Sequence, residues 1–267
     1  MSVPLLPHLS TIRERIESAE CVLLGLDYDG TLTPIVDDPK RAVLSPETRE
    51  VLGVLASRPD ISVALVSGRS LDDLRTCVAM ENLIYAGNHG LDISGRGLRF
   101  VEATAVAEQG GLSELAQTLA VRLQGIAGAI VENKTLTISV HFRCVAAHER
   151  NRLQHIVEGA VAEGNHRFRP TLGHKVIEIR PRVDWHKGQA LRWIQDQLGQ
   201  REALVLYLGD DETDENAFYA MQDAITIKVG DPSDTSAHYH VEAPDNVRDF
   251  LFWLERVTTK SAKETAP

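Results

Sequence analysis

Two aspartates, Asp27 and Asp29, stand two residues apart where an apolar run ends and a turn with Gly30 and Thr31 begins. At such a place the first carboxylate can attack phosphorus while the second handles the proton of the leaving oxygen. A divalent cation between them would offset the repulsion between carboxylates and phosphate. For a bare Asp-x-Asp, an acidic turn that caps a strand is the commoner explanation. We set that explanation aside because three further motifs follow, each where a strand is expected to end.

The second and third motifs supply a hydroxyl and two cationic side chains. Ser67-Gly68-Arg69 directly follows an apolar run, and a hydroxyl, backbone N–H groups and a guanidinium at such a turn can cradle a phosphate. Lys187-Gly188 stands at a predicted helix start, where the lysine would neutralise aspartate and phosphoryl charge together. Taken alone, Ser-Gly is an ordinary turn and a lysine is usually solvated, so both interpretations depend on the other motifs.

The fourth motif is acidic: five of the six residues 210–215 are Asp or Glu, directly after another apolar run. They would repel one another without a cation to hold them. Asp210 is the expected third metal ligand, with Asp211 or Asp214 in its outer shell or orienting Lys187. A helix N-terminus also favours acidic residues, but that does not explain two aspartates before the helix. The residues assigned to the metal site are Asp27, Asp29, Asp210, Asp211 and Asp214.

Composition narrows the class of protein. The 267 residues are 43% hydrophobic, enough for one large domain or two smaller ones. A net charge of −10, without a basic stripe interleaved with aromatic residues, argues against a dedicated nucleic-acid binder. Cys21, Cys77 and Cys144 lie far apart without metal-type spacing, so we expect reduced thiols. No signal peptide and no apolar run of about 20 residues is found, so we expect a cytoplasmic protein without a membrane partner.

The elements that must position these residues follow an α/β pattern. Apolar strands at 21–26, 61–66 and 83–86 alternate with helical segments, which predicts a parallel sheet with ligands at the carboxyl ends of its strands. From about residue 90 the order becomes strand, strand, helix, strand, strand, which predicts a separate antiparallel α+β unit. After Arg182 the α/β pattern resumes, and the polar residues 258–267 are expected to fray.

The motifs together resemble a known group of enzymes. Asp-x-Asp-Gly-Thr, Ser-Gly-Arg, Lys-Gly and Gly-Asp-Asp-x-x-Asp occur in the order found in the haloacid dehalogenase-like superfamily. Tyr28 between the aspartates excludes the Asp-Lys-Thr of P-type ATPases. Closer still, the chain resembles the trehalose-6-phosphate phosphatases from about residue 21 to 250. The segments that carry this resemblance are Leu26-Asp27-Tyr28-Asp29-Gly30-Thr31-Leu32, Gly87-Asn88-His89-Gly90, Val131-Glu132-Asn133-Lys134, His141-Phe142-Arg143 and Glu178-Ile179-Arg180-Pro181.

The resemblance implies an α/β fold with a Rossmann-like parallel-sheet core at 1–104 and 182–267 and an inserted smaller α+β cap domain at 105–181. It implies Mg²⁺-dependent hydrolysis of trehalose 6-phosphate to trehalose and phosphate through an aspartyl-phosphate. The catalytic residues would be Asp27 as nucleophile, Asp29 as general acid and then base, and Ser67 and Lys187 on the phosphoryl group. The substrate-binding residues would be Glu132, Lys134 and Glu178 in the cap, with Arg69, Asn88, His89, Gly90, Arg143 and Lys175 as further candidates.

Other functions are considered beside this one. The four motifs fit sucrose-phosphate or glucosyl- and mannosyl-phosphoglycerate phosphatases equally, and only the cap residues favour trehalose 6-phosphate. A non-catalytic sugar-phosphate-binding module would be expected to have lost at least one of four residues that are all present here: Asp27, Asp29, Lys187 and Asp210. A phosphomutase would need to retain a phosphorylated co-substrate. Because this sequence lacks a glycosyltransferase domain, we also expect a functional link to a trehalose-6-phosphate synthase.

Overall fold

The computed structural model describes residues 2–36, 39–164, 167–173 and 175–264, which form two compact units. The larger unit consists of Met1–Arg99 with His186–Pro267, and the smaller one of Phe100–Trp185. The larger is an α/β unit built on a mostly parallel sheet, so the predicted fold class is confirmed. Within the described ranges, we find no helix long and apolar enough to cross a membrane.

A nine-stranded sheet forms the larger unit, in the order β1-β13-β12-β11-β2-β3-β4-β5-β6. The strands from β1 to β4 in this order pair in parallel, and β5 is antiparallel to β4. The bounds are β1 Val3–Pro4, β2 Val22–Leu26, β3 Ile61–Val66, β4 Ile84–Gly87, β5 Asp92–Gly95, β6 Leu98–Val101, β11 Leu204–Gly209, β12 Ile225–Val229 and β13 Tyr239–Val241.

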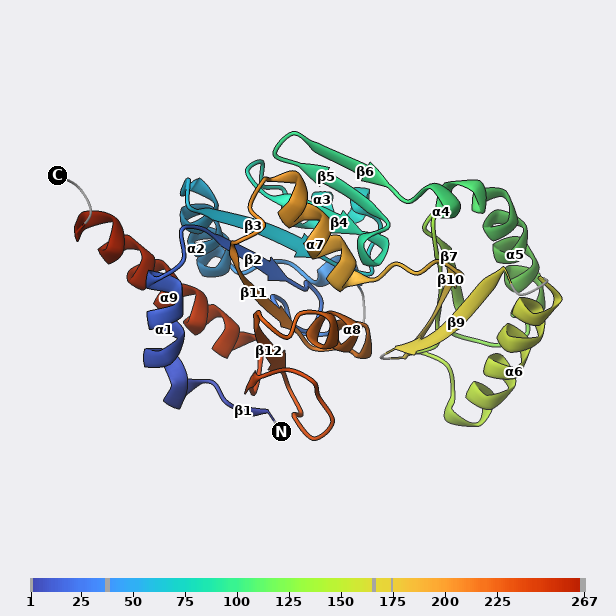
Figure 1. Cartoon of the computed structure of the whole chain (residues 1–267). Coiled ribbons are helices and arrows are strands. Elements are labelled where there is room, and N and C mark those ends of the chain that lie inside the picture. Colours follow the sequence, from blue (N-terminus) through green and yellow to red (C-terminus); the bar gives the residue numbers. More distant parts are fainter. Residues whose placement is uncertain (1, 37–38, 165–166, 174, 265–267) are drawn as a thin grey trace. The chain divides into compact units, whose positions relative to one another are not determined.

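Helices cover both faces of this sheet (Figure 1). Every residue of β2 and β3 is buried, as expected for parallel strands covered on both sides. On one face the core joins β2 and β3 to α1, α2, α3 and α9, and on the other Leu191 of α7 lies against Gly25. The bounds are α1 Leu9–Glu17, α2 Pro46–Ser57, α3 Leu71–Val78, α7 Lys187–Gln197, α8 Glu212–Ala220 and α9 Pro244–Glu264, with short 3₁₀ turns η1 Leu6–His8, η2 Pro39–Arg41 and η3 Asn88–Gly90.

The ends of several helices add detail to this picture. Ser45 and Ser70 cap α2 and α3 with their side chains. The expectation that residues 258–267 fray is wrong up to Glu264, because α9 continues to that residue, and residues 265–267 lie outside the described part of the chain. Its buried residues, among them Val247, Leu251 and Leu254, form one apolar stripe that packs on the core and outweighs the polar composition of its end. Helix α1 was not predicted.

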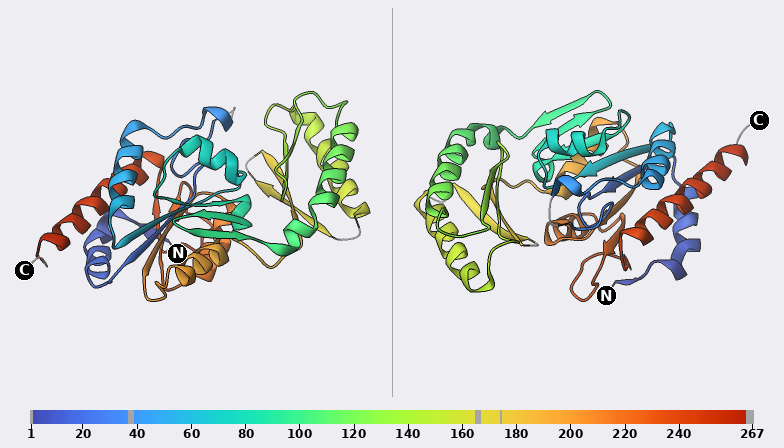
Figure 2. Two further views of the ribbon diagram at one scale, coloured as in Figure 1. Left: turned by 90° about the horizontal axis from the view of Figure 1, so that it is seen from above. Right: turned by 180° about the vertical axis from the view of Figure 1, so that it is seen from behind.

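The smaller unit has a four-stranded antiparallel sheet in the order β7-β8-β10-β9. Helices α5 and α6 lie side by side on one face of it (Figure 2), and their apolar residues share a core with Ile138, Val140, Ile177 and Ile179. Alternation along the strands turns the residues between these to the other face. The bounds are β7 Ile130–Asn133, β8 Ile138–His141, β9 Phe168–Gly173, β10 Val176–Pro181, α4 Ala103–Ala107, α5 Gln109–Arg122 and α6 Ala147–Glu163.

Candidate active site

Four neighbouring parallel strands bring the predicted motifs to one edge of the sheet. Asp27 follows β2, Ser67 follows β3, Asn88 follows β4 and Asp210 follows β11. These strands are adjacent in the order β11-β2-β3-β4, so their carboxyl ends meet at this edge. Ligands of open α/β sheets bind at such an edge. The structure therefore brings together, from residues far apart in the sequence, the groups that the motifs predicted.

Lys187 joins two of the acidic residues in the interior of this site. Its Nζ lies 2.7 Å from Asp27 Oδ1 and 2.7 Å from Asp214 Oδ1, and only 2% of the lysine side chain is exposed. The Tyr207 hydroxyl donates a second hydrogen bond to Asp214 Oδ1. Asp214 Oδ2 accepts the backbone N–H groups of Asp210 and Asp211, at 3.1 and 3.0 Å. Both oxygens of Asp214 are thus occupied, and its carboxylate orients Lys187.

Asp210 is held close to the first motif. A Cβ on Gly30, whose φ is +90°, would lie 2.1 Å from Asp210 Oδ2, so only glycine leaves room for this carboxylate. Thr31 Oγ1 donates to Asp210 Oδ1 at 3.2 Å, and Lys228 Nζ donates to the Asp210 carbonyl at 2.5 Å. Carboxylate oxygens of Asp27, Asp210 and Asp214 lie within 4.8 Å of one another, close enough to share a metal ion.

The electrostatics of this cluster favour a cation. Burial raises the pKa of Asp27 well above its ordinary value, and the charges of Asp214 and Asp210 add to this against the attraction of Lys187. Burial and the charge of Asp214 raise the pKa of Asp210 to about 7. Burial lowers the pKa of Lys187, but the charges of Asp214 and Asp27 outweigh it and raise that pKa above its ordinary value. One ammonium thus faces three carboxylates, and a divalent cation would neutralise the excess negative charge.

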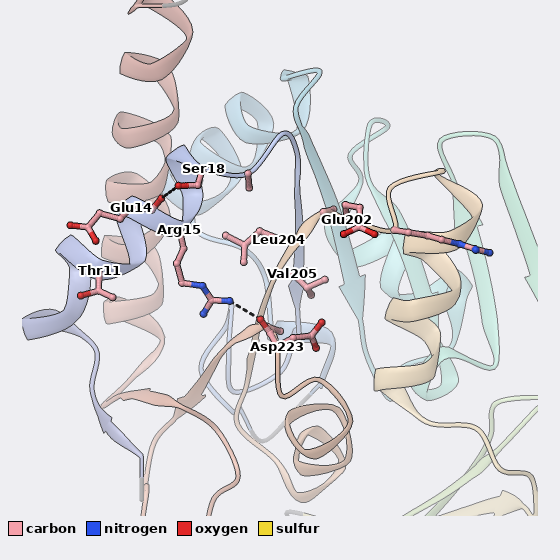
Figure 3. A pocket seen from close by; sticks show the side chains of 12 residues that line it. Thr11, Glu14, Arg15, Ser18, Glu202, Leu204, Val205 and Asp223 are labelled. Carbon is pink, nitrogen blue, oxygen red and sulfur yellow. Dashed lines mark hydrogen bonds between the residues drawn. The ribbon is translucent and has the colours of Figure 1, made fainter.

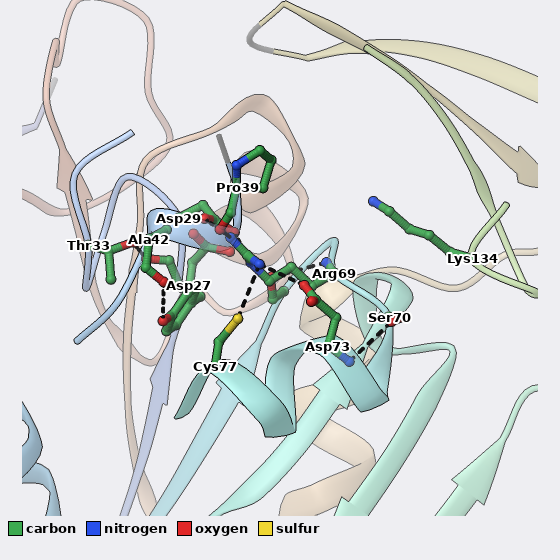
Figure 4. Close-up of polar contacts among 12 residues, drawn as sticks. Asp27, Asp29, Thr33, Pro39, Ala42, Arg69, Ser70, Asp73, Cys77 and Lys134 are labelled. Carbon is green, nitrogen blue, oxygen red and sulfur yellow. Dashed lines mark hydrogen bonds and ion pairs between the residues drawn. The ribbon is translucent and has the colours of Figure 1, made fainter. Parts of the chain in front are cut away.

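Asp29 points to a different partner (Figure 4). Arg69 binds both carboxylate oxygens, with Nε 2.7 Å from Oδ2 and Nη2 2.7 Å from Oδ1. The guanidinium also binds Asp73. Burial by itself lowers the pKa of Arg69, but the hydrogen bonds and charges of Asp29 and Asp73 raise it above its ordinary value. Arg69, predicted to bind substrate, therefore has protein carboxylates as its partners in this structure.

The loop after β4 packs against the Ser67-Gly68-Arg69 turn. Asn88 and His89 have left-handed backbone φ angles of 49° and 60°, and both side chains are buried. The His89 backbone N–H donates to the Ser67 carbonyl at 2.8 Å. A Cβ on Gly68 would lie 2.8 Å from Cε1 of the His89 ring, so the imidazole packs directly on the turn. Asn88, His89 and Gly90 thus lie at the same edge as Ser67.

In the smaller unit, side chains from three strands share the sheet face that α5 and α6 leave uncovered. The predicted residues Glu132 on β7 and Glu178 on β10 are both cross-strand neighbours of Ser139 on β8. Glu178 Oε1 accepts from Ser139 Oγ at 2.6 Å and from Lys134 Nζ at 3.3 Å. Glu132 Oε2 lies 2.9 Å from His141 Nε2, and this hydrogen bond lowers the pKa of Glu132. The face therefore carries a polar row with two carboxylates.

The remaining predicted residues lie in turns. Arg143 follows β8 and is half-buried, and Lys175 is exposed in the β9–β10 turn with a φ of 60°. The Lys175 carbonyl accepts the Phe142 N–H at 3.0 Å, which brings these two turns together. Asp211 is the N-cap of α8, and its Oδ1 accepts the Glu212 N–H at 2.7 Å.

Sequence reasoning missed Tyr207. It lies in β11 among apolar neighbours, where a tyrosine is usually core, and it is fully buried. Burial and the charge of Asp214 raise its pKa well above the ordinary value, so the phenol stays neutral and donates its hydrogen to Asp214. The only local signal was a polar side chain two residues before Gly209 in an otherwise apolar strand. The partner itself could not be predicted from that signal.

An open pocket of about 510 Å³ lies elsewhere in the larger unit (Figure 3). Leu204 and Val205 at the start of β11 line it, with Arg15 of α1, whose Nη2 donates to the Asp223 carbonyl at 2.6 Å. Since Asp210 follows the other end of β11, this pocket belongs to the opposite edge of the sheet. It is lined by no predicted site residue.

Known proteins resemble this chain in sequence and in fold. A sequence profile of the trehalose-phosphatase family matches residues 25–246. Trehalose 6-phosphate phosphatase RA3 of Zea mays is 38% identical over 250 residues, covering 86% of this chain and 68% of that protein. A solved trehalose-6-phosphate phosphatase related protein has a TM-score of 0.78 at 26% identity, covering 89% of this chain and 99% of that chain.

The fold extends to more distant hydrolases. A haloacid dehalogenase-like hydrolase from Bacteroides thetaiotaomicron has a TM-score of 0.61 at 16% identity, with 88% of this chain and 99% of that chain covered. The trehalose-phosphatase family that the motifs resembled is thus found, and the more distant likeness shows a shared fold. With its acidic residues, lysine and serine gathered at the carboxyl edge of the sheet, the chain belongs to the trehalose-phosphatase family of phosphoric monoester hydrolases.

Proposed function

We propose that this chain hydrolyses trehalose 6-phosphate to trehalose and phosphate. One observation carries the proposal: Asp27, at the carboxyl end of the central strand β2, is buried, hydrogen-bonded to Lys187 and within reach of two further carboxylates. Its relatives are trehalose 6-phosphate phosphatases by name. A buried aspartate beside a fixed cation is suited to nucleophilic attack on a phosphate monoester.

In the first step an Asp27 carboxylate oxygen forms a bond to phosphorus while the bond from phosphorus to the sugar oxygen breaks. Asp29 gives its proton to that sugar oxygen, so trehalose leaves as a neutral alcohol. In the second step Asp29 takes a proton from water as the water oxygen attacks the aspartyl-phosphate. Phosphate is released and Asp27 is restored. Ser67, which accepts the Arg69 N–H at 3.2 Å, would donate its hydroxyl hydrogen to the phosphoryl group, and Lys187 would neutralise its charge.

The residues present fit a magnesium ion. The donors are buried carboxylates in close proximity, and burial and the charge of Asp214 raise the pKa of Asp210, so a cation at this place would stabilise its ionised form. We propose that Asp27, Asp210 and the Asp29 carbonyl would hold Mg²⁺, whereas Asp214 orients Lys187 because both of its oxygens are occupied. When bound, Mg²⁺ would neutralise charge on the phosphoryl oxygens.

We also propose that the smaller unit acts as the cap that recognises the sugar. Glu132, Lys134 and Glu178 on its uncovered face would hold glucose hydroxyls, since a carboxylate can accept two hydroxyl hydrogen bonds. Such groups suit an uncharged disaccharide better than an apolar pocket would. The substrate has to be made by glycosyl transfer onto a sugar phosphate, which supports a functional link to a trehalose-6-phosphate synthase.

The deciding experiment is phosphate release in Mg²⁺ from trehalose 6-phosphate, sucrose 6-phosphate, glucose 6-phosphate and glucosyl-3-phosphoglycerate. We expect a strong preference for trehalose 6-phosphate. Preference for another ester would keep the Asp27 chemistry and overturn the assignment of Glu132, Lys134 and Glu178. Absence of release from all four would favour a binding module. Oxygen-18 from water in the released phosphate is expected for a hydrolase and not for a phosphomutase.

A further inference from the structure

Arg69 has no N–H left for a substrate. Its Nε and one Nη2 hydrogen go to the two oxygens of Asp29, each at 2.7 Å. The other Nη2 hydrogen goes to the Pro39 carbonyl at 2.8 Å. Nη1 donates to Asp73 Oδ2 at 2.6 Å and to Cys77 Sγ at 3.4 Å. A guanidinium has five N–H donors, and the protein uses all five (Figure 4).

The arginine is also fixed in place by its surroundings. Only 6% of its side chain is exposed, and its Cζ lies 5.2 Å from the centre of the Tyr28 ring. Tyr28 is itself anchored, because its hydroxyl donates to the Ala42 carbonyl at 2.8 Å. Asp73 is in the first turn of α3, which Ser70 caps through the Asp73 N–H. The direction of the guanidinium is therefore set by α3 and the Tyr28 ring.

We propose that Arg69 and Asp73 are a pair of positioning residues that aim the Asp29 carboxylate at the leaving oxygen. This rests on the proposed function, in which Asp29 is the general acid and base. The forked contact fixes the plane of the Asp29 carboxylate, whose side chain is 39% exposed and would otherwise turn freely. Each of its oxygens keeps a second lone pair that can carry the proton. Asp73 acts through Arg69, because it accepts a hydrogen bond from Nη1 and so fixes the guanidinium that binds Asp29.

Positioning of a general acid has a chemical signature. A sugar alkoxide is a poor leaving group and needs a proton as it departs, whereas p-nitrophenolate leaves as a stable anion. Both esters transfer phosphorus to Asp27, so a defect in the nucleophile or in phosphate binding would slow both. A misdirected Asp29 would lower kcat/KM only for the sugar ester, because kcat/KM covers the steps up to phosphoryl transfer. The later hydrolysis of the aspartyl-phosphate is common to both esters and affects kcat alone. The ratio of kcat/KM for the sugar ester to kcat/KM for the aryl ester therefore measures how well the Asp29 carboxylate is oriented.

The test compares Asp73→Asn and Arg69→Lys with the unchanged chain on trehalose 6-phosphate and p-nitrophenyl phosphate. Asp72→Asn is the matched control, because Asp72 is also acidic and in the first turn of α3 but is not among the hydrogen-bond partners of Arg69. For Asp73→Asn and Arg69→Lys we expect kcat/KM to fall about ten- to a hundredfold on the sugar ester and less than about threefold on the aryl ester. Asp72→Asn should leave both values unchanged.

The other outcomes have separate meanings. An equal loss on both esters, with weaker inhibition by inorganic phosphate, would place Arg69 on the substrate phosphate and overturn the inference. Unchanged or increased rates in both variants would overturn it as well. If Asp29→Asn itself lowers kcat/KM equally for both esters, or the unchanged chain does not hydrolyse trehalose 6-phosphate, the proposed function fails first. The free energy of unfolding of each variant in urea shows whether a loss of activity comes from a loss of stability or from a misoriented Asp29 carboxylate.

Discussion

Lys187 and Asp27 are 160 positions apart in the sequence, yet Lys187 Nζ lies 2.7 Å from Asp27 Oδ1. The lysine begins α7 and the aspartate directly follows β2, so contact between them depends on α7 packing on the sheet. The same ammonium contacts Asp214, which is fixed in turn by Tyr207. Asp27, the proposed nucleophile, is thus held by a chain of buried polar groups drawn from α7, α8 and β11.

Asp27→Asn should abolish phosphate release while the protein stays folded. The amide has the shape of the carboxylate but cannot form the aspartyl-phosphate. Because burial raises the pKa of Asp27, removing its charge should not lower the urea midpoint of the metal-free protein. Acid quenching followed by mass spectrometry should find the phosphoryl adduct on Asp27 of the unchanged chain. A variant with near-normal turnover would refute the mechanism.

Tyr207→Phe should destabilise the protein and slow it. The change removes a buried hydrogen bond to a charged acceptor, which costs about 1.5–3 kcal/mol of unfolding free energy, and it loosens the carboxylate that orients Lys187. Urea unfolding and kcat are the measurements. Tyr219→Phe is the control, since Tyr219 is 76% exposed. Equal effects of the two substitutions would contradict a special role for Tyr207.

Gly30→Ala should displace Asp210. The new Cβ would overlap Asp210 Oδ2, and the positive φ adds backbone strain of about 1–2 kcal/mol. Gly97→Ala separates the two effects, because Gly97 has a φ of +81° but nothing within 4 Å of an added Cβ. Both variants should lose stability, and only Gly30→Ala should need more Mg²⁺ for half-maximal activity. The same Mg²⁺ requirement in both would argue against Asp210 as a metal ligand.

Glu178→Gln should weaken recognition of the sugar. Loss of a buried charged acceptor for two hydroxyls is expected to cost about 1.5–3 kcal/mol, roughly ten- to 150-fold in kcat/KM for trehalose 6-phosphate. Hydrolysis of p-nitrophenyl phosphate, which has no sugar, should be unaffected. Glu163→Gln is the control in the same unit, because its pair with Arg122 is exposed. A parallel loss on both esters would place Glu178 outside sugar recognition.

Metal binding should change how stability depends on pH. The pKa of Asp210 is raised to about 7, so the folded state binds this proton more tightly than the unfolded state does. Its contribution to stability is complete at low pH and is lost as pH rises from about 4 through about 7. In chelator, Tm should therefore fall more between about pH 5 and about pH 8 in the unchanged chain than in Asp210→Asn.

Adding Mg²⁺ provides the second half of that test. The ion binds the ionised carboxylates, so it should raise Tm more at about pH 8 than at about pH 5. Asp210→Asn should reduce this rise. An equal rise of Tm in Asp210→Asn would mean that Mg²⁺ binds elsewhere, and then Asp210 would not be a ligand.

The sequence by itself determined the strands and the motifs that follow them. The strand predicted at 61–66 is β3, the one predicted at 21–26 begins one residue before β2, and the one predicted at 83–86 is shifted by one residue from β4. Such strands are readable because a parallel strand buried on both faces is a short, continuously apolar run. Since polar residues directly after these runs must lie at one edge of the sheet, Asp27, Ser67 and Asp210 could be grouped without coordinates.

Only the tertiary structure decided which of these groups touch. Arg69 looked like a phosphate ligand from its motif, but its partners are Asp29, 40 residues earlier, and Asp73 on the following helix. Tyr207 looked like a core residue until its neighbour was known to be Asp214. Side-chain partners depend on rotamer and packing across elements that are distant in sequence, and no local pattern encodes them. The residue types in the motifs indicate the chemistry of the site, whereas tertiary packing determines which hydrogen bonds position those residues.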